Sequence, residues 1–374
     1  MKKQIAALAC LMLLLFSVTS CNSWKGPAAN NTTEDTQTER NTQDQASTGG
    51  TSGTSDITGG NNPTWDFEYM DNGDGTCIIT GYTGEPSGEL IIPNEIGGLR
   101  VTEIGDTAFF ACYGFEGRLV ISESVESIGD LALTACWGIT SIEVAEQNPV
   151  YTSVDGILFS KDKSKIVRAP EGMRMENYII PNGVTTIGEY AFSDCKYFIG
   201  SLTIPDGVTF IGESAFSNCG GFTGSLTIPD SVTSIGESAF FACYNFSGNL
   251  KLSAGLTRIE DMVFGTCPGF TGSLIIPENV TYIGSMAFSS CKGFTGTLII
   301  PESVTEIGMS AFVNCPGLNL VEFRGDAPAL SLYVFADDRN GRQIPYRDGF
   351  KILYNPAKSG WSTPEWNGYP TYPK

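Results

Sequence analysis

The sequence predicts an α/β solenoid, a right-handed superhelix of coils with a parallel β-sheet, and three observations support this. A nine-residue phrase ending in cysteine recurs eight times along the chain. From Cys195 to Cys315 the copies are 24 residues apart. Leu, Ile, Val and Phe recur at fixed positions on the same period. A unit of this size cannot bury its own apolar face, so stacked units must share one core.

Each unit contains two short apolar segments that we expect to form strands. The first, Leu-x-Ile-Pro, alternates with period two and ends at proline, which cannot donate to a sheet ladder. The second, Val-x-x-Ile, is followed by glycine, where we expect a turn into a helical or 3₁₀ segment that carries Ala-Phe and the cysteine. Acidic residues after this glycine suit the N-terminus of a helix. They are Glu189, Glu213, Glu237 and Asp261.

The phrases Leu-x-Ile-Pro-x-x-Val-Thr-x-Ile-Gly and Ala-Phe-x-x-Cys resemble the leucine-rich repeats of BspA-like bacterial surface proteins and of the related treponemal class. The resemblance covers residues 90–318. It implies a leucine-rich-repeat solenoid with its parallel sheet on the concave side. It also implies attachment to protein ligands, in the host extracellular matrix or on other bacteria. Periodicity by itself predicts only the stacking, and the step to adhesion is an analogy.

The N-terminus reads as an export signal followed by a tether. Residues 1–20 combine Lys2 and Lys3 with an apolar run that is too short to span a bilayer. Val18 to Cys21 resembles the bacterial lipobox, which implies cleavage before Cys21 and lipidation of that cysteine. Residues 21–62 are polar and predict a disordered tether. We therefore expect an exported lipoprotein of the outer membrane or cell surface; the alternative is an ordinary signal peptide cleaved nearby.

Three regions depart from the repeat. Residues 63–89 alternate around an Asp/Gly-rich turn and predict a β-hairpin N-cap. The turn, residues 71–75, also invites a calcium interpretation, but glycine stands at the third and fifth ligand positions of an EF-hand loop. An insertion at about 139–178 predicts a hairpin. Residues 319–374 are rich in aromatic residues and proline and predict a C-terminal cap.

The charge and composition exclude several classes of function. A formal net charge of −19 repels nucleic acid and anionic lipid headgroups, so we expect membrane contact only through the lipid anchor. The chain has no histidine, the commonest general base and transition-metal ligand. No nucleophile–base pair, phosphate-binding loop or metal motif is visible. We therefore predict a protein that is not an enzyme and needs no metal or cofactor.

The repeat cysteines are predicted to be free. Cys10 leaves with the signal and Cys21 is the lipidation site, so nine cysteines remain. Side chains at equivalent positions of stacked coils point the same way, which disfavours disulfides between coils. We expect buried thiols that pack as small hydrophobic groups, with disulfide pairing as the alternative.

Candidate binding residues follow from the outward positions of the two strands. On the first strand they form a stripe that we expect along the concave sheet: Thr203, Thr227, Lys251, Ile275 and Ile299. On the second strand the outward positions with interface-type side chains are Phe210, Arg258 and Tyr282, beside Thr186, Ser234 and Glu306. Coverage of these residues by a loop or cap is the alternative.

The function predicted from these features is a protein-binding or adhesion module at the cell surface. A surface glycan-binding protein, in which exposed Tyr and Trp rings stack on sugars, is an alternative. A structural scaffold of the cell envelope is another.

Overall fold

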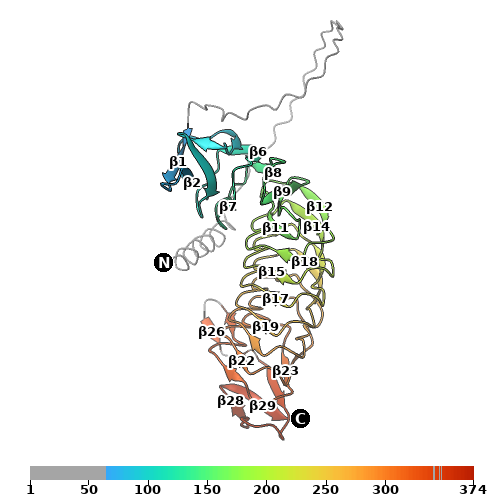
Figure 1. The fold of residues 1–374 in the computed structure, drawn as a ribbon. Helices are drawn as coiled ribbons and strands as arrows, with labels where there is room; N and C mark the ends of the chain where they lie inside the picture. Colours follow the sequence, from blue (N-terminus) through green and yellow to red (C-terminus); the bar gives the residue numbers. More distant parts are fainter. Residues whose placement is uncertain (1–64, 340–341, 345, 347) are drawn as a thin grey trace, which may run out of the picture. The chain divides into compact units, whose positions relative to one another are not determined.

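In a computed structural model, residues 65–339, 342–344, 346 and 348–374 are described, and they form a stack of β-coils (Figure 1). All of them belong to one compact unit, Asp56–Lys374. The stack is a β-solenoid of about 11 turns. The predicted signal and the tether through residue 62, including Cys21, lie outside the described residues.

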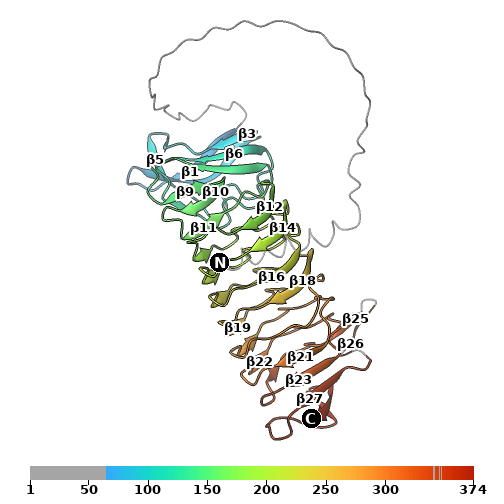
Figure 2. The same cartoon turned by 90° about the vertical axis from the view of Figure 1, so that its right-hand side faces the viewer.

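Two parallel ladders run along the stack, one for each apolar segment of the repeat (Figure 2). Each is interrupted in places, but the strands within a run pair in register. The first ladder contains β3 (Gly88–Ile91), β6 (Phe115–Ile121), β8 (Ile139–Val144), β12 (Met175–Ile179), β14 (Phe198–Thr203), β16 (Gly224–Thr227), β18 (Phe246–Lys251), β21 (Thr297–Ile300), β23 (Leu320–Phe323), β27 (Lys351–Tyr354) and β29 (Tyr369–Pro373).

The second ladder is formed by shorter strands that come from the Val-x-x-Ile segments. Most of them contain two residues, because the glycine that follows turns the chain away. They are β2 (Thr76–Gly84), β5 (Leu99–Ile104), β7 (Ser127–Ile128), β11 (Lys165–Arg168), β13 (Thr186–Ile187), β15 (Phe210–Ile211), β17 (Ser234–Ile235), β19 (Arg258–Ile259), β20 (Tyr282–Ile283), β22 (Glu306–Ile307) and β24 (Ala329–Leu330).

The α/β part of the prediction is wrong: no residue in the described ranges lies in a helix. The segment that carries Ala-Phe and cysteine is a series of turns. Two residues in each copy from Cys195 onward have a left-handed backbone, such as Ser214 at φ 52° and Asn218 at φ 58°, and the first two copies have one each, Ala111 and Ala135. An α-helix cannot pass through such residues. The acidic residues that follow the glycine therefore face no helix N-terminus.

Hydrogen bonds between coils explain why turns replace a helix. Alternate amides of this segment donate to the next coil: Phe192 N to Ala215 O at 2.7 Å and Asp194 N to Ser217 O at 2.8 Å. The amides between them close tight turns within the coil, such as Ser193 N to Tyr190 O. Half of the donors that a helix would need are therefore used to hold the next coil, and the turns form a third line of contact along the stack.

Close stacking favours glycine at two positions of most coils. A Cβ atom on Gly236, which follows the second strand, would lie 2.4 Å from the amide nitrogen of Glu213. A Cβ on Gly269, two residues after the cysteine, would lie 2.1 Å from the carbonyl oxygen of Phe246. Both neighbours are backbone atoms of the preceding coil and cannot move aside independently. These glycines therefore set how closely successive coils approach.

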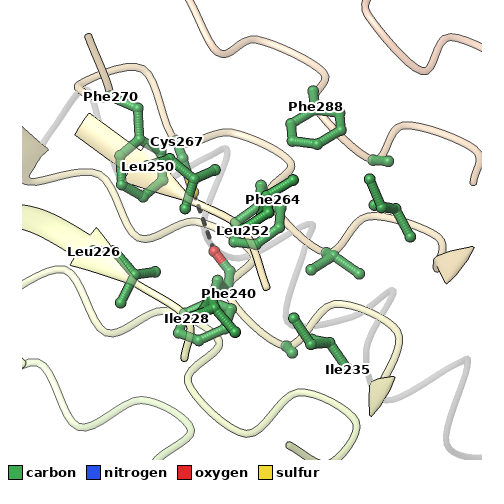
Figure 3. Close-up of a cluster of buried hydrophobic side chains, with 14 of the residues drawn as sticks. Leu226, Ile228, Ile235, Phe240, Leu250, Leu252, Phe264, Cys267, Phe270 and Phe288 are labelled. Atoms are coloured by element: carbon green, nitrogen blue, oxygen red, sulfur yellow. Dashed lines mark hydrogen bonds between the residues drawn. The ribbon is translucent and has the colours of Figure 1, made fainter. Parts of the chain in front are cut away.

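The core is a repeating column of buried side chains (Figure 3). Leu226 and Leu250 come from the first ladder, and phenylalanines from the turns stack face to face on their equivalents in neighbouring coils. One such stack runs from Phe192 to Phe335, with ring centroids 5.0–5.6 Å apart and planes within 12° of parallel. Stacked aromatic rings contribute beyond the area that they bury, so the core stabilises the register as well as the fold.

All nine cysteines of the described residues are buried and free. Their thiols do more than fill space. Cys243 Sγ lies 3.1 Å from Phe216 O, and Cys267 Sγ lies 3.1 Å from Phe240 O, each a bond to the preceding coil. Burial raises the pKa of Cys243 to about 12, so the thiol stays protonated and can donate. The cysteine column is a line of weak hydrogen bonds along the stack.

The two ends are closed by different elements. At the N-terminal end β1 (Trp65–Asp71) pairs antiparallel with β2, and β4 (Glu95–Ile96) pairs with β5. At the C-terminal end β28 (Glu365–Trp366) folds back on β29, while β25 (Asp337–Arg339) and β26 (Arg342–Ile344) form a separate hairpin. The aromatic C-terminal region does more than cover the last coil, because β27 and β29 extend the first ladder.

The insertion is a three-stranded meander instead of a simple hairpin. β10 (Ile157–Ser160) pairs antiparallel with β11, as the sequence predicts, and also with β9 (Tyr151–Val154). β11 then pairs in parallel with β13 and returns the chain to the second ladder. The insertion is therefore part of the stack, and it lies between the two clusters into which the buried core divides.

A buried ion pair connects the coils on either side of the insertion. The Arg168 guanidinium lies 2.7 Å from the Glu171 carboxylate and also donates to Leu133 O and Tyr190 O. Glu171 accepts a hydrogen bond from Ala135 N at 2.8 Å. In regular coils the neighbouring backbone supplies such partners. At this junction two side chains supply them, so the stack continues across an irregular segment.

The close approach of coils leads to a first prediction. Gly269→Ala should lower the free energy of unfolding by about 2 kcal/mol or more, because the new methyl group overlaps the Phe246 carbonyl. Gly220→Ala is the matched control, since its Cβ would meet only a side-chain atom of Tyr244 at 3.7 Å. Urea unfolding of the two variants compares them directly. Equal stability would contradict the proposed role of Gly269.

The ion pair leads to a second prediction. Burial raises the pKa of Glu171 from 4.5 to about 8, and Arg168 offsets part of the effect. Between these values the folded chain binds more protons than the unfolded chain, so this group's contribution to stability falls as pH rises. The stability advantage of the wild type over Glu171→Gln should therefore shrink from pH 5 to pH 8 in urea unfolding. Glu176→Gln, at an exposed position of β12, is the control. If the stability difference between the wild type and Glu171→Gln stays constant with pH, the raised pKa of Glu171 is rejected.

Candidate binding surface

The outward stripe predicted on the first ladder is present. Thr203, Thr227 and Lys251 are exposed, Ile275 is 73% exposed and Ile299 is half-buried. Thr227 pairs with Lys251 in parallel register, and Ile275 bridges to Ile299. No residue of another coil covers Ile275, so it presents an apolar side chain to solvent.

Sequence reasoning missed the N-terminal end of this stripe. Ile179 on β12 pairs with Thr203 and is 65% exposed. The signal was present, because Tyr178-Ile179-Ile180-Pro181 has the spacing of Leu-x-Ile-Pro with tyrosine in place of leucine. The stripe therefore has an apolar group on either side of a polar centre. Its polar centre is Thr203, Thr227 and Lys251, and Lys251 lies 3.6 Å from the exposed Asp230 carboxylate.

The residues predicted on the second ladder form a separate stripe. Thr186 pairs with Phe210, and Phe210 with Ser234; further along, Arg258 pairs with Tyr282. Phe210 is 36% exposed and has no ring partner among the described residues. The candidate residues are thus divided between two ladders.

Arg258 and Tyr282 bind each other. The Arg258 guanidinium lies 4.1 Å from the centre of the Tyr282 ring and forms a 2.8 Å ion pair with Glu260. The Tyr282 hydroxyl donates to the Asp261 carboxylate at 3.1 Å. Partial burial, together with the Asp261 carboxylate, raises the pKa of Tyr282 to about 12. This pair is held in place within the fold, which makes it a less adaptable contact than Phe210.

In the acidic turn of the N-terminal hairpin, the Asp71 and Asp74 carboxylates accept hydrogen bonds from other residues of the turn. Asp71 accepts from Gly73 N at 2.7 Å, and Asp74 accepts from both the amide and the hydroxyl of Thr76. These bonds lower the pKa of Asp74. In the described part of the chain, no group of three or more His, Cys, Asp or Glu residues could hold a metal ion. The same residues contain no helix long and apolar enough to cross a membrane.

Comparisons with known proteins identify the repeat. The family model for the BspA type leucine rich repeat region matches six copies, over residues 89–175, 168–295 and 270–357. No curated protein matches the chain. A leucine-rich repeat protein from Eubacterium ventriosum is similar in structure, with a TM-score of 0.51 and 19% identity over 75% of this chain and 97% of that one.

Two further solved structures resemble the chain less closely. A leucine-rich repeat protein from Bacteroides ovatus has 22% identity and a TM-score of 0.44 over 78% of this chain and 70% of that one. A leucine rich cell surface protein from Faecalibacterium prausnitzii has 20% identity and a TM-score of 0.38, over 69% and 93%. Identities this low indicate a shared fold at most. The family model covers more than half of the sequence, and the chain belongs to the BspA-type leucine-rich-repeat family.

Proposed function

We propose that this protein is a cell-surface adhesion module that binds a protein ligand along the outward stripe of the first ladder. The observation that carries the proposal is the exposure of Ile179, in β12, and of Ile275, at a β-bridge to Ile299. Their backbone is held in the ladder, so the apolar side chains are presented by a rigid support. Exposed apolar groups on such a support are typical of contact sites between proteins.

The polar centre of the stripe can take part in the same contact. Thr203, Thr227 and Lys251 lie between the apolar positions and offer hydrogen-bonding groups to a ligand that reaches both. The parallel ladder places equivalent side chains ~4.8 Å apart. A protein surface of matching spacing can therefore contact several coils at once, and the energy of many small contacts adds up.

Surface display is the second part of the proposal. The charged and apolar N-terminus and the lipobox-like Val18 to Cys21 support export and lipidation. The polar stretch that follows supports a tether that holds the solenoid away from the bilayer. The likeness of the repeat to bacterial surface proteins agrees with this location. A purely structural role in the envelope would use the same anchor but would not require exposed isoleucines.

Substitutions borrowed from the repeat itself test the binding stripe. Ile179→Thr and Ile275→Thr introduce the residue that stands at the equivalent positions 203 and 227, so the ladder should be preserved. We expect the double variant to bind a retained partner about tenfold more weakly, since truncated interface anchors cost that much or more. Pull-down from extracellular-matrix proteins and from neighbouring bacteria supplies the partners, and surface plasmon resonance measures the affinity.

Ile199→Thr is the matched control for this experiment. Ile199 is 51% exposed and begins the same type of strand, but it lies outside the stripe, and threonine stands at its equivalent positions. Phe210→Ser tests the second ladder in the same way. Unchanged binding of every retained partner by the double variant would reject the first-ladder stripe, and a loss confined to Phe210→Ser would move the site to the second.

The anchor has its own prediction. Cys21→Ser should leave the protein unlipidated and shift it from the membrane fraction to the soluble exported fraction, because the serine cannot form the thioether. Mass spectrometry of the mature N-terminus should find a lipid on Cys21 in the wild type. An unmodified cysteine, or a wild type that is already soluble, would rule out the anchor without bearing on the binding stripe.

A further inference from the structure

A second surface, just before the starts of first-ladder strands, gathers exposed aromatic rings. Tyr113 and Trp137 each follow the cysteine of their coil and lie on adjacent coils. Tyr113 is 61% exposed and Trp137 is 44% exposed, and their ring centres are 5.1 Å apart. Large rings at such exposure bury little area in the fold, so packing alone does not account for them.

Two cations extend this row across the junction beside the insertion. Lys196 Nζ lies 5.0 Å from the Trp137 ring and 5.3 Å from the Tyr197 ring. The Arg174 guanidinium lies 4.6 Å from the centre of the Tyr197 ring. These contacts connect three rings and two cations along one surface, which we name the aromatic–cationic row. Its residues, in order, are Tyr113, Trp137, Lys196, Tyr197 and Arg174.

The other coils show that the fold does not require these residues. Outside the row the position after the cysteine carries different residues, namely Gly220, Tyr244, Pro268, Lys292 and Pro316, so its side chain is not part of the core. The next position is glycine in six of the eight copies.

Tyr197 stands at a position that is glycine in six of the eight copies and asparagine, Asn245, in one other. In the neighbouring regular coil, a Cβ on Gly221 would lie 2.3 Å from Phe198 O. Before Tyr197 the preceding coil is the irregular end of the insertion, and Met175 N donates to the Tyr197 carbonyl at 3.3 Å. The end of the insertion thus lies next to Tyr197 and supplies Arg174 beside its ring. The row begins on two coils of regular spacing, at Tyr113 and Trp137, and continues across the insertion to Tyr197.

The charge of the row is unusual for this chain. Acidic residues outnumber basic ones by 41 to 22, and Arg100, Arg118, Arg168 and Arg258 all pair with carboxylates. Arg174 and Lys196 form no ion pair with any described residue. Glu171, buried against Arg168, and Asp194, which accepts from the Ser193 hydroxyl at 3.2 Å, form no ion pair with Lys196, although the charge of Lys196 opposes the rise in the pKa of both carboxyls. Two cations are thus available to an anionic ligand.

We propose that the aromatic–cationic row binds a saccharide that carries a carboxylate. The faces of Trp137 and Tyr113 suit the C–H face of a pyranose ring, which is apolar, while the sugar hydroxyls stay in water. Lys196 and Arg174 donate charge-assisted hydrogen bonds to the carboxylate. A nucleic acid would also stack on the rings, but its continuous phosphate backbone would be repelled by the acidic surface around them. This site is distinct from the proposed ladder stripe.

Titration calorimetry of the full chain with two matched sugars tests the proposal. The first probe is a hyaluronan hexasaccharide, in which every second sugar carries a carboxylate. The second is the same hexasaccharide after its carboxyl groups are reduced to alcohols, which keeps the rings and removes the charge. We expect the acidic form to bind, and the reduced form to bind at least about tenfold more weakly.

Three variants separate stacking from charge. Trp137→Ala should weaken binding of the acidic sugar about tenfold or more, as expected for a central anchor ring. Lys196→Gln should reduce the difference between the acidic and reduced sugars. Tyr244→Ala, which truncates an exposed ring at the equivalent repeat position outside the row, should bind like the wild type. An unchanged thermal unfolding midpoint checks the fold, and Tyr113→Ala replaces Trp137→Ala if that variant unfolds.

Several outcomes would overturn the proposal. They are failure of the wild type to bind the acidic hexasaccharide, equal binding of its reduced form, and unchanged binding by both ring variants. Tighter binding of single-stranded oligothymidylate than of the acidic sugar would assign the row to nucleic acid instead. None of these results bears on the ladder stripe, because Ile179 and Ile275 are intact in every variant.

Discussion

Backbone hydrogen bonds between neighbouring coils keep the chain on a period of 24 residues, and the other features of the structure depend on that period. Such a bond forms only if its donor nitrogen and its acceptor oxygen, on successive coils, come within ~3 Å of each other. This approach leaves no room for a Cβ atom at Gly236 or Gly269. It also brings each buried phenylalanine into a stack with its equivalent. The stacked core and the thiol bonds are therefore consequences of one spacing.

The same constraint explains which parts of the fold could be predicted from the sequence. Period, strand positions, buried faces and the free cysteines depend on side-chain patterns, and the structure shows all of them. The prediction of a helical segment assumed that its backbone amides bond within the segment. Ser214 and Asn218 adopt left-handed conformations, and their own amides donate to Glu237 O and Phe241 O of the next coil. A local pattern cannot show that a donor is used by a residue 23 positions away, as it is between Phe192 and Ala215.

The binding residues show a similar division. The outward positions on the first strand followed from alternation, and the structure places Thr203, Thr227, Lys251 and Ile275 on one exposed stripe. Ile179 was missed because tyrosine replaced the leucine that marked the strand. The contacts of Arg258 could not be read from spacing, since Glu260 and Tyr282 engage it from different directions. The aromatic–cationic row was also hidden, because Trp137 and Lys196 are 59 residues apart in sequence.

A regular repeat limits how distinctive a binding surface can be, because equivalent positions tend to carry equivalent residues. The insertion removes this limit at one place. It brings Arg174 next to the ring of Tyr197, which stands where most copies have glycine. The cost is an irregular junction, which Arg168 and Glu171 hold by supplying hydrogen bonds that the backbone no longer supplies. A buried ion pair is a poor source of net stability. Its presence is better understood as the means by which the solenoid keeps its stacking on both sides of a site that the repeat itself could not form.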